Sequence, residues 1–448
     1  MGDFTPHTEP DIAAMLTFCG LSSVDELFEA VPAAIHLASG QLDVPPGLSE
    51  PDTLAVMAEL ADANRVGREL ICFAGGGAYD HEVASVVRRV GFRAEFVTAY
   101  TPYQPEVAQG VLQALFEYQT MVARLAGLPI ANASLYDGAT ATVEGANLAV
   151  AATGCPSVIV SEGVNPRTRA VLATMAAGTG QVLTGAPLNA RGTTEWADDP
   201  TPAGAVIVQY PNYLGVIEDL AAARAAADRR GALLVVVMDP VAVGLLRSPG
   251  ESGADVVTGE GQPFGTPLSF GGPYVGLFAC RLEQVRRLPG RLVGETVDAR
   301  GARAYVTTLR TREQDIRRER ATSNVCTNQT LIAVCFAIQL GWLGTAGLRE
   351  LALRCARGTR YARESLLSIS GVSPLVTGPT VREFAVQTPC DAATVVERMA
   401  EEGYLAGLPL APGELTGADG RGLLVAVTER RTRAEIDAFA AALDKVIR

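Results

Sequence analysis

The sequence predicts an α/β protein with a doubly wound, mostly parallel sheet, a smaller C-terminal α+β domain and an N-terminal helical arm. Between about residues 70 and 325, short apolar runs rich in Val and Ile alternate with helical patterns. Continuous apolar runs of this kind are typical of strands buried on both faces of a parallel sheet. The 448 residues, 48% of them hydrophobic and 19% charged, also provide enough apolar material for a large and a smaller domain.

The helical arm is expected to span residues 1–68. Its first helix should begin after Thr8, because Asp11 follows at the spacing of a capping box, and it should end at Gly20. Another helix is predicted over residues 51–67. A small independent helical domain is the alternative interpretation of this region.

The large α/β domain is expected to span residues 69–326. Its strands are predicted at 157–160, 205–210, 233–239, 254–258 and 274–280. Its helices are predicted at 105–127, 139–152, 166–178 and 216–230. This alternation favours a doubly wound sheet with helices on both faces.

The small domain is expected to span residues 327–448. It should begin with one or two long helices over 327–365 and end with a helix over 432–447. Between these helices, VREFAVQ and GLLVAVT have the composition of strands.

The composition argues against several classes of protein. The formal net charge of −12 disfavours binding to nucleic acid or to an anionic membrane. No run of about 18 apolar residues lacks a charge, Gly or Pro, so no membrane span is expected. The N-terminus has early acids and no signal-like apolar run, which favours the cytoplasm. The eight cysteines form no CxxC pair and there are only three histidines, so we expect buried free thiols and no metal site.

Chemistry is expected where strands end, because ligands of doubly wound sheets bind at the carboxyl ends of the strands. Asp239 follows one predicted strand, and a long Gly/Pro-rich loop, 259–273, follows the next. Gly138 and Thr140 stand at the start of a helix, where free N–H groups suit a phosphate. An acid for the ring nitrogen, a phosphate cup and a loop for a lysine form the layout of a pyridoxal phosphate (PLP) site. Taken singly, the acid could be a helix cap and the small residues could only close a turn.

The lysine that such a site requires is missing. The only lysine is Lys445, among 37 basic residues. A preference for arginine codons explains the general scarcity of lysine, but it does not explain its absence from one functional position.

Seven segments resemble the glycine cleavage system P-protein family, glycine dehydrogenase (decarboxylating). They are FAGGGAYDHEVASVV, TAYTPYQPEVAQGVLQALFEYQT, IANASLYDGATA, VQYPNYLGVIEDL, GADVVTGEGQPFGTPLSFGGPY, PGRLVGETVD and REQDIRRERATSNVCTNQ. The resemblance covers residues 7–447, and TAYTPYQPE and RATSNVCTNQ are specific to the family. It implies the fold of PLP-dependent transferases of fold type I, as in aspartate aminotransferase.

In many bacteria this family is split into two homologous subunits, and the chain resembles subunit 1, the N-terminal half. The resemblance implies an α₂β₂ heterotetramer with subunit 2, which bears the PLP, and no activity for the chain alone. The assembly would decarboxylate glycine and transfer the aminomethyl group to the lipoyl group of the H-protein.

The resemblance also implies where the lysine is missing. In the catalytic half, a His-Lys pair follows the strand that corresponds to residues 253–257, and this pair falls on Gln262 and Pro263. The chain would therefore bind no PLP covalently, and Asp239, Gly138 and Thr140 would be inherited structure.

In fold type I enzymes the active site lies at a subunit interface, so the chain is expected to lend residues to the site of its partner. The candidates for catalysis lie in TAYTPYQPE: Thr98, Tyr100, Tyr103 and Gln104. The candidates for the partner's PLP phosphate lie in RATSN: Thr322, Ser323 and Asn324. Alternatively, the tyrosines pack in the interface and RATSN caps the helix that follows.

Other interpretations remain open at this stage. The arginine-rich segment 310–320 could be a solvated, ion-paired helix, or it could contact the partner's cofactor phosphate or the lipoyl carrier. Arg320 stands where the family has lysine, and a planar guanidinium does not replace an ammonium at a direct contact. The runner-up function is a regulatory or scaffolding pseudoenzyme that contributes no catalytic residue. An independent enzyme with another nucleophile is disfavoured, because no Ser-His or Cys-His pairing is visible.

Overall fold

The computed structural model describes residues 7–37, 43–65, 69–99, 102–413, 415 and 419–448. The chain divides into two compact units, Met1–Arg65 and Val66–Arg448. The first unit contains α1 (Glu9–Cys19), the 3-10 helix η1 (Asp25–Phe28) and α2 (Glu50–Asp62). The capping box of Thr8 and the left-handed Gly20 after α1 are as predicted. No residue of α1 or α2 is buried, so these helices do not form the core that an independent domain requires.

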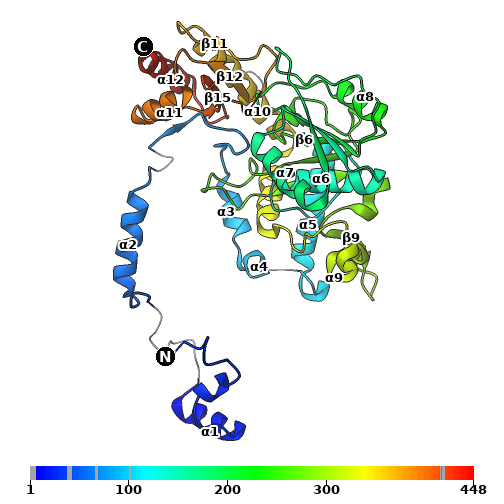
Figure 1. Cartoon of the computed structure of the whole chain (residues 1–448), viewed down its shortest axis with the longest axis vertical. Coiled ribbons are helices and arrows are strands. Elements are labelled where there is room, and N and C mark those ends of the chain that lie inside the picture. Colours follow the sequence, from blue (N-terminus) through cyan, green and yellow to red (C-terminus); the bar gives the residue numbers. More distant parts are fainter. Residues whose placement is uncertain (1–6, 38–42, 66–68, 100–101, 414, 416–418) are drawn as a thin grey trace. The chain divides into compact units, whose positions relative to one another are not determined.

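A seven-stranded sheet forms the centre of the second unit (Figure 1), in the order β2-β8-β7-β6-β5-β3-β4. Strands β4, β3, β5, β6 and β7 are parallel, and β8 and β2 continue the sheet in antiparallel pairings. The bounds are β2 (Ile130–Ala131), β3 (Ser157–Ser161), β4 (Val182–Ala186), β5 (Ala205–Tyr210), β6 (Leu233–Met238), β7 (Val256–Glu260) and β8 (Gly276–Cys280).

Helices cover both faces of this sheet, as the apolar strands predict. One face packs against α5 (Gln109–Ala126), α8 (Leu220–Arg230) and the first half of α10 (Thr330–Leu367). The other face packs against α6 (Gly138–Thr153) and α7 (Pro166–Thr179). Alternate residues of each strand face opposite layers: Val206 and Leu234 lie in the first core, and Ala205 and Val235 in the second.

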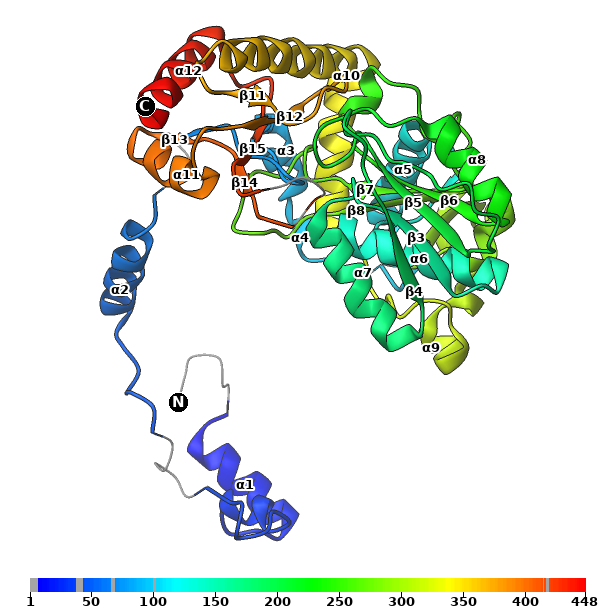
Figure 2. The same cartoon turned by 45° about the horizontal axis from the view of Figure 1, so that its top comes forward.

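Helix α10 joins the large sheet to a smaller one (Figure 2). It is kinked at Gly344, whose φ is 60° and ψ −175°. By length and composition it alone among the described helices is apolar enough to cross a membrane. Many of its apolar side chains are nevertheless core residues, such as Phe336 in the large core and Leu366 in the C-terminal core, although Trp342 is exposed.

The C-terminal sheet is antiparallel, in the order β11-β12-β15-β14. Its strands are β11 (Ser373–Pro374), β12 (Glu383–Gln387), β14 (Leu408–Leu410) and β15 (Gly422–Ala426). Helices α11 (Ala392–Glu401) and α12 (Arg433–Ile447) pack on it. A parallel pair, β1 (Ile71–Cys72) with β13 (Tyr404–Leu405), joins the start of the second unit to this C-terminal region.

Short elements border the sheets. They are α3 (Ser85–Gly91), α4 (Ala94–Val97), the 3-10 helices η3 (Ala242–Gly244) and η4 (Leu282–Arg287), and a hairpin of β9 (Leu292–Val297) and β10 (Arg303–Thr308).

Several boundaries differ from the predicted ones. The helix expected over 105–127 is divided at Ala108 into the 3-10 helix η2 (Pro105–Val107) and α5. The helix expected over 216–230 begins only after Asp219, whose side chain accepts two amides of the first turn of α8.

The arginine-rich segment is not one solvated helix. It forms three single turns, η5 (Arg310–Arg312), α9 (Gln314–Arg317) and η6 (Arg318–Arg320), interrupted at Arg318 with φ 51°. Arg310 is ion-paired with Asp315 at 2.8 Å. Arg312 instead turns inward and donates to the carbonyl oxygens of Leu288 and Gly290. The expectation of buried thiols is also only partly right, because Cys19 and Cys326 are exposed.

Candidate functional site

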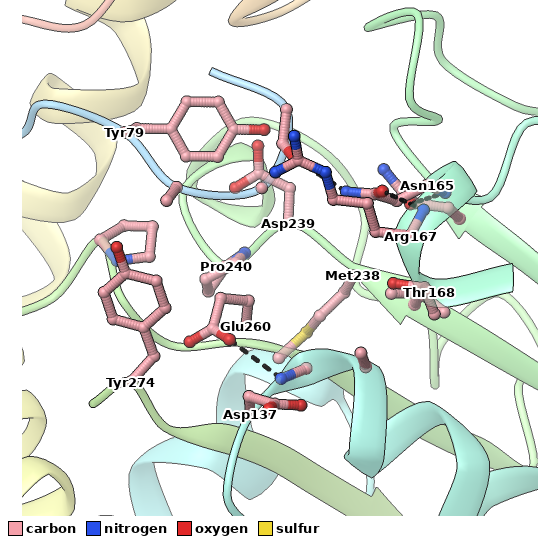
Figure 3. A pocket seen from close by; sticks show the side chains of 18 of the residues that line it. Tyr79, Asp137, Asn165, Arg167, Thr168, Met238, Asp239, Pro240, Glu260 and Tyr274 are labelled. Atoms are coloured by element: carbon pink, nitrogen blue, oxygen red, sulfur yellow. Dashed lines mark hydrogen bonds between the residues drawn. The ribbon is translucent and has the colours of Figure 1, made fainter. Parts of the chain in front are cut away.

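A cavity of about 430 Å³ lies at the carboxyl ends of β5, β6 and β7 (Figure 3). It is bordered by the glycine-rich loop 76–79, by the start of α6 and by the loop after β7. Of the residues predicted for the cofactor-like site, Asp239, Gly138 and Pro263 line this cavity, and Thr140 does not.

Asp239 follows β6, as expected, but its charge is engaged within the protein. Its Oδ2 lies 2.8 Å from Nη2 of Arg382, and its Oδ1 accepts the amide of Val241 at 2.9 Å. The side chain of Arg382 is only 3% exposed and lies 3.5 Å from the ring centre of Tyr79. In a PLP site the positive partner of this acid would be the protonated ring nitrogen of the cofactor. Here the guanidinium of Arg382 already takes that place.

His81 continues this buried network. Its Nε2 lies 2.6 Å from Nη1 of Arg382. A guanidinium only donates, so Nε2 accepts and the proton lies on Nδ1, which donates to Glu429 at 2.6 Å. Burial lowers the pKa of His81 and favours this neutral form.

His81, Glu429 and Cys355 form one cluster of metal-ligand types within the described ranges. The guanidinium of Arg382 already occupies the ring nitrogen that faces away from Glu429. A cation there would meet a permanent positive charge, so the cluster does not fit a metal ion.

The start of α6, predicted as a phosphate cup, is closed by carboxylates of the chain itself. Asp137 caps the helix and accepts the amide of Thr140 at 2.7 Å. Glu260 accepts the amide of Gly138 at 2.9 Å, as the dashed line in Figure 3 marks. A Cβ at position 138 would lie 2.9 Å from the Cβ of Glu260, so only glycine permits this approach.

The environment of Glu260 is unusual for a carboxyl group. It also accepts the amides of Gln262 at 3.0 Å and Val275 at 3.2 Å. Despite these bonds, burial raises its pKa to about 8. At neutral pH the cup therefore holds a largely protonated side chain of the protein.

The residues present do not fit covalently bound PLP. The loop position expected for lysine is Pro263, the ring acid is paired with Arg382, and the phosphate cup is capped by Glu260. The only lysine, Lys445, lies in α12 and is ion-paired with Glu402 at 2.7 Å. All three anchors of such a cofactor are absent or taken.

The residues predicted to be lent to a partner lie outside this cavity. Thr98 follows α4, is exposed, and donates its hydroxyl to the carbonyl oxygen of Ala94 at 2.6 Å. Tyr103 is 56% exposed and Gln104 is exposed. Tyr100 lies outside the described residues.

The second predicted stretch lies between η6 and α10. Thr322 and Asn324 are exposed, whereas Ser323 is half-buried and accepts the amide of Val325 at 3.1 Å. Ser323 also bonds to Glu144, whose pKa burial raises to about 7. The stretch does not cap the following helix, because α10 begins at Thr330 after Gln329.

Residues that the sequence reasoning missed connect the two stretches. The guanidinium of buried Arg291 lies 4.7 Å from the ring centre of Tyr103. The carbonyl oxygen of Arg291 accepts the amide of Ala133 at 2.9 Å, and Asn328 donates to the carbonyl oxygen of Ala133 at 2.7 Å. Tyr103 and Asn328 are thus linked through Arg291 and Ala133. Arg291, Ala133 and Asn328 each lie in a segment that the sequence singled out, but nothing local in the chain indicated that these segments meet.

Comparison with known proteins agrees with the fold and the motifs. The family model described as "Glycine cleavage system P-protein" matches residues 3–443. "Probable glycine dehydrogenase (decarboxylating) subunit 1" of Moorella thermoacetica is 46% identical over 99% of both chains. The protein of the same name from Geotalea daltonii is 46% identical over 98% of this chain and 99% of its own.

Solved structures agree as well. The structure titled "Crystal structure of glycine decarboxylase (P-protein) of the glycine cleavage system, in inhibitor-bound form" superposes with a TM-score of 0.93 at 44% identity, and covers 99% of this chain and 100% of its own. A sphingosine-1-phosphate lyase of Burkholderia pseudomallei superposes with a TM-score of 0.63 at 17% identity, over 93% and 94% of the two chains. The fold is that of PLP-dependent transferases of fold type I, as predicted.

Proposed function

The chain belongs to the glycine cleavage system P-protein family, and on this premise we propose that it is the subunit of glycine decarboxylase that carries no PLP. Its relatives are named subunit 1 of glycine dehydrogenase (decarboxylating), so the activity is that of an assembly with another subunit. In this proposal a homologous subunit 2 bears the cofactor. The two form an α₂β₂ heterotetramer in the cytoplasm, and glycine and the lipoyl H-protein are the substrates.

The observation that supports this proposal best is the state of the cavity. Lysine is replaced by Pro263, Asp239 is paired with Arg382, and Glu260 occupies the cup. Arg382 and Glu260 thus satisfy groups that the cofactor would otherwise satisfy, and Pro263 offers no amine to bind it. Asp239 and the amide of Gly138 are therefore already paired within the chain.

In the proposed reaction, PLP bound to the partner supplies the electron sink for loss of CO₂ from glycine. This chain's part is to complete the walls of that site. Tyr103 is held over Arg291, and Gln104 presents an amide that can both donate and accept. Thr322 and Asn324 are exposed donors suited to the partner's phosphate.

Closure by this wall would also exclude water. Since CO₂ loss leaves a carbanion-like carbon, water at that carbon would protonate it before the aminomethyl group reaches the lipoyl disulfide. Side chains that fill the wall and hold its polar groups in place would reduce this premature protonation.

The proposal is tested by glycine–CO₂ exchange in the assembled complex. Gln104→Ala and Asn324→Ala should lower the exchange rate by about 10-fold or more while the subunits still coelute, because each removes one positioned hydrogen bond. Thr174→Ala is a matched control, since Thr174 is exposed on α7. Full activity of both variants, or of subunit 2 without this chain, would instead favour a scaffold without catalytic residues.

A further inference from the structure

A second cavity, of about 370 Å³, lies in the C-terminal part of the chain and is unusually basic. Its lining comes from the second half of α10 and from the segment that leads into α12. We call it the arginine groove, after Arg354, Arg357, Arg431 and Arg433, which line it together with Gly358, Tyr361, Glu429 and Ile436.

The acids near the arginine groove neutralise only part of its charge. One oxygen of Glu429 accepts from His81 at 2.6 Å and the other accepts the amide of Glu82 at 2.8 Å. Glu350 is bonded to Nε of Arg354 at 2.8 Å. Glu435 accepts the amide of Thr432 at 2.6 Å in the capping box of α12 and lies 4.0 Å from Arg431. Among the described residues, none of these carboxylates pairs with Arg357 or Arg433.

Many guanidinium donors remain unused. Arg357 has no hydrogen-bond or ion-pair partner within the described part of the chain. The side chain of Arg431 is only 6% exposed; its terminal nitrogens are ion-paired with Asp80 at 3.3 Å and Glu435 at 4.0 Å, and only its Nε is buried without a partner. Arg433 uses Nε on the hydroxyl of Tyr361 at 3.1 Å, and its terminal nitrogens have no hydrogen-bond partner among the described residues.

Of these four arginines, Arg354 and Arg431 are ion-paired, whereas Arg357 and the terminal nitrogens of Arg433 have no acidic partner among the described residues. The protein as a whole has a net charge of −12, so this concentration of positive charge is not a feature of its general composition. The positive end of the α12 dipole adds to it. An oxyanion in the groove would satisfy the donors of Arg357 and Arg433 that face no acceptor.

We propose that the arginine groove binds a small phosphate-bearing ligand. A phosphate ester carries a charge of about −1.5 to −2 and three acceptor oxygens, which suits several arginines better than a single carboxylate does. The cavity volume is within the range of small-molecule sites, about 300–1,000 Å³, and four arginines line it. This favours a small molecule over an acidic protein surface.

The arginine groove is distinct from the cofactor-like cavity, although the two share a wall of hydrogen bonds. Glu429 lines the groove, and His81 and Arg382 connect it to Asp239 in the cavity. The proposal does not depend on the proposed function, because none of the residues lent to the partner lines the groove.

The test is calorimetric titration of the assembled complex with inorganic phosphate, with adenosine 5′-monophosphate and with adenosine. Arg357→Gln removes an exposed, unpartnered arginine of α10. Arg360→Gln is the matched control, because Arg360 is exposed on the same helix, lies outside the groove and is paired with Glu364. Thermal unfolding of each variant confirms that it is folded.

We expect saturable binding of phosphate or of the monophosphate, weakened about 10-fold by Arg357→Gln and unchanged by Arg360→Gln. Binding of the monophosphate alone would identify an ester as the ligand, and binding of phosphate alone would identify the free ion. Binding of neither up to about 10 mM would overturn the proposal, as would equal loss in both variants. Binding of adenosine as tight as that of the monophosphate would also overturn it.

Discussion

The carboxyl group that closes the phosphate cup should make the protein less stable as the pH rises. Glu260 accepts three backbone amides, and burial nevertheless raises its pKa to about 8 from an ordinary value of 4.5. The folded state therefore binds a proton that the unfolded state has already lost between these values. The stability that this group contributes is fully present below about pH 4.5 and is lost as the pH rises through about 8.

The size of this loss follows from the interval between the two pKa values of Glu260. Within that interval the free energy of unfolding falls by about 1.4 kcal/mol for each pH unit. Glu260 is half-buried at the edge of the cavity, so solvent reduces this loss. We therefore expect the wild-type chain to lose about 2 kcal/mol through this group between pH 6 and pH 8.

Glu260→Gln removes the titration and keeps an oxygen that can accept the amide of Gly138. Urea unfolding at pH 6 and pH 8, followed by the fluorescence of Trp196 and Trp342, measures the free energy of unfolding of both proteins. Glu295→Gln is the control, because Glu295 is exposed on β9. The variant should gain about 2 kcal/mol relative to wild type between the two pH values, and the control should not. An equal difference at both pH values would refute the assignment of a raised pKa to Glu260.

Three further predictions concern the same network and its surroundings. Asp239→Ala leaves buried Arg382 without its carboxylate and should destabilise the folded chain by about 3–5 kcal/mol. The melting temperature should fall accordingly. A change under about 1 kcal/mol would mean that the ion pair contributes little to stability. Burial lowers the pKa of His81, so as the pH falls the unfolded state binds a proton before the folded state does. The free energy of unfolding should therefore fall as the pH drops below about 6.5, and it should fall less in His81→Gln. The same pH profile in the variant and the wild type would count against a neutral imidazole in the folded state. Gly215→Ala should prevent accumulation of soluble protein, because φ there is +78° and a Cβ would lie 1.9 Å from the carbonyl oxygen of Glu383; normal yield and melting temperature would show that the turn can adjust.

The fold was predictable because its signals are local in the chain. The strands of the large sheet are short Val- and Ile-rich runs, and Asp137, Asp219 and Thr432 cap helices by contacts within a few residues. Element boundaries failed where a turn competed with a helix, as at Ala108 and before Leu220. The kink of α10 at Gly344 agrees with the prediction of one or two long helices over 327–365, although its position was not predicted.

The site was predictable in its positions but not in its electrostatics. The sequence placed Asp239, Gly138 and Pro263 at one cavity, because strand ends of a parallel sheet meet at one edge. It did not reveal that Arg382, which is distant in the chain, neutralises Asp239, or that Glu260 closes the cup. Such pairings depend on how separate segments pack, and no periodicity or spacing encodes them. The same holds for Arg291 beneath Tyr103 and for the arginine groove.

We propose that this chain completes an active site without holding a cofactor. A titration of the cofactor-free complex with PLP, followed both by Schiff-base absorbance and by glycine–CO₂ exchange, tests this directly. Absorbance and activity should saturate together at one PLP for each pair of unlike subunits. Saturation at two PLP per pair, or a Schiff base on this chain alone, would contradict it.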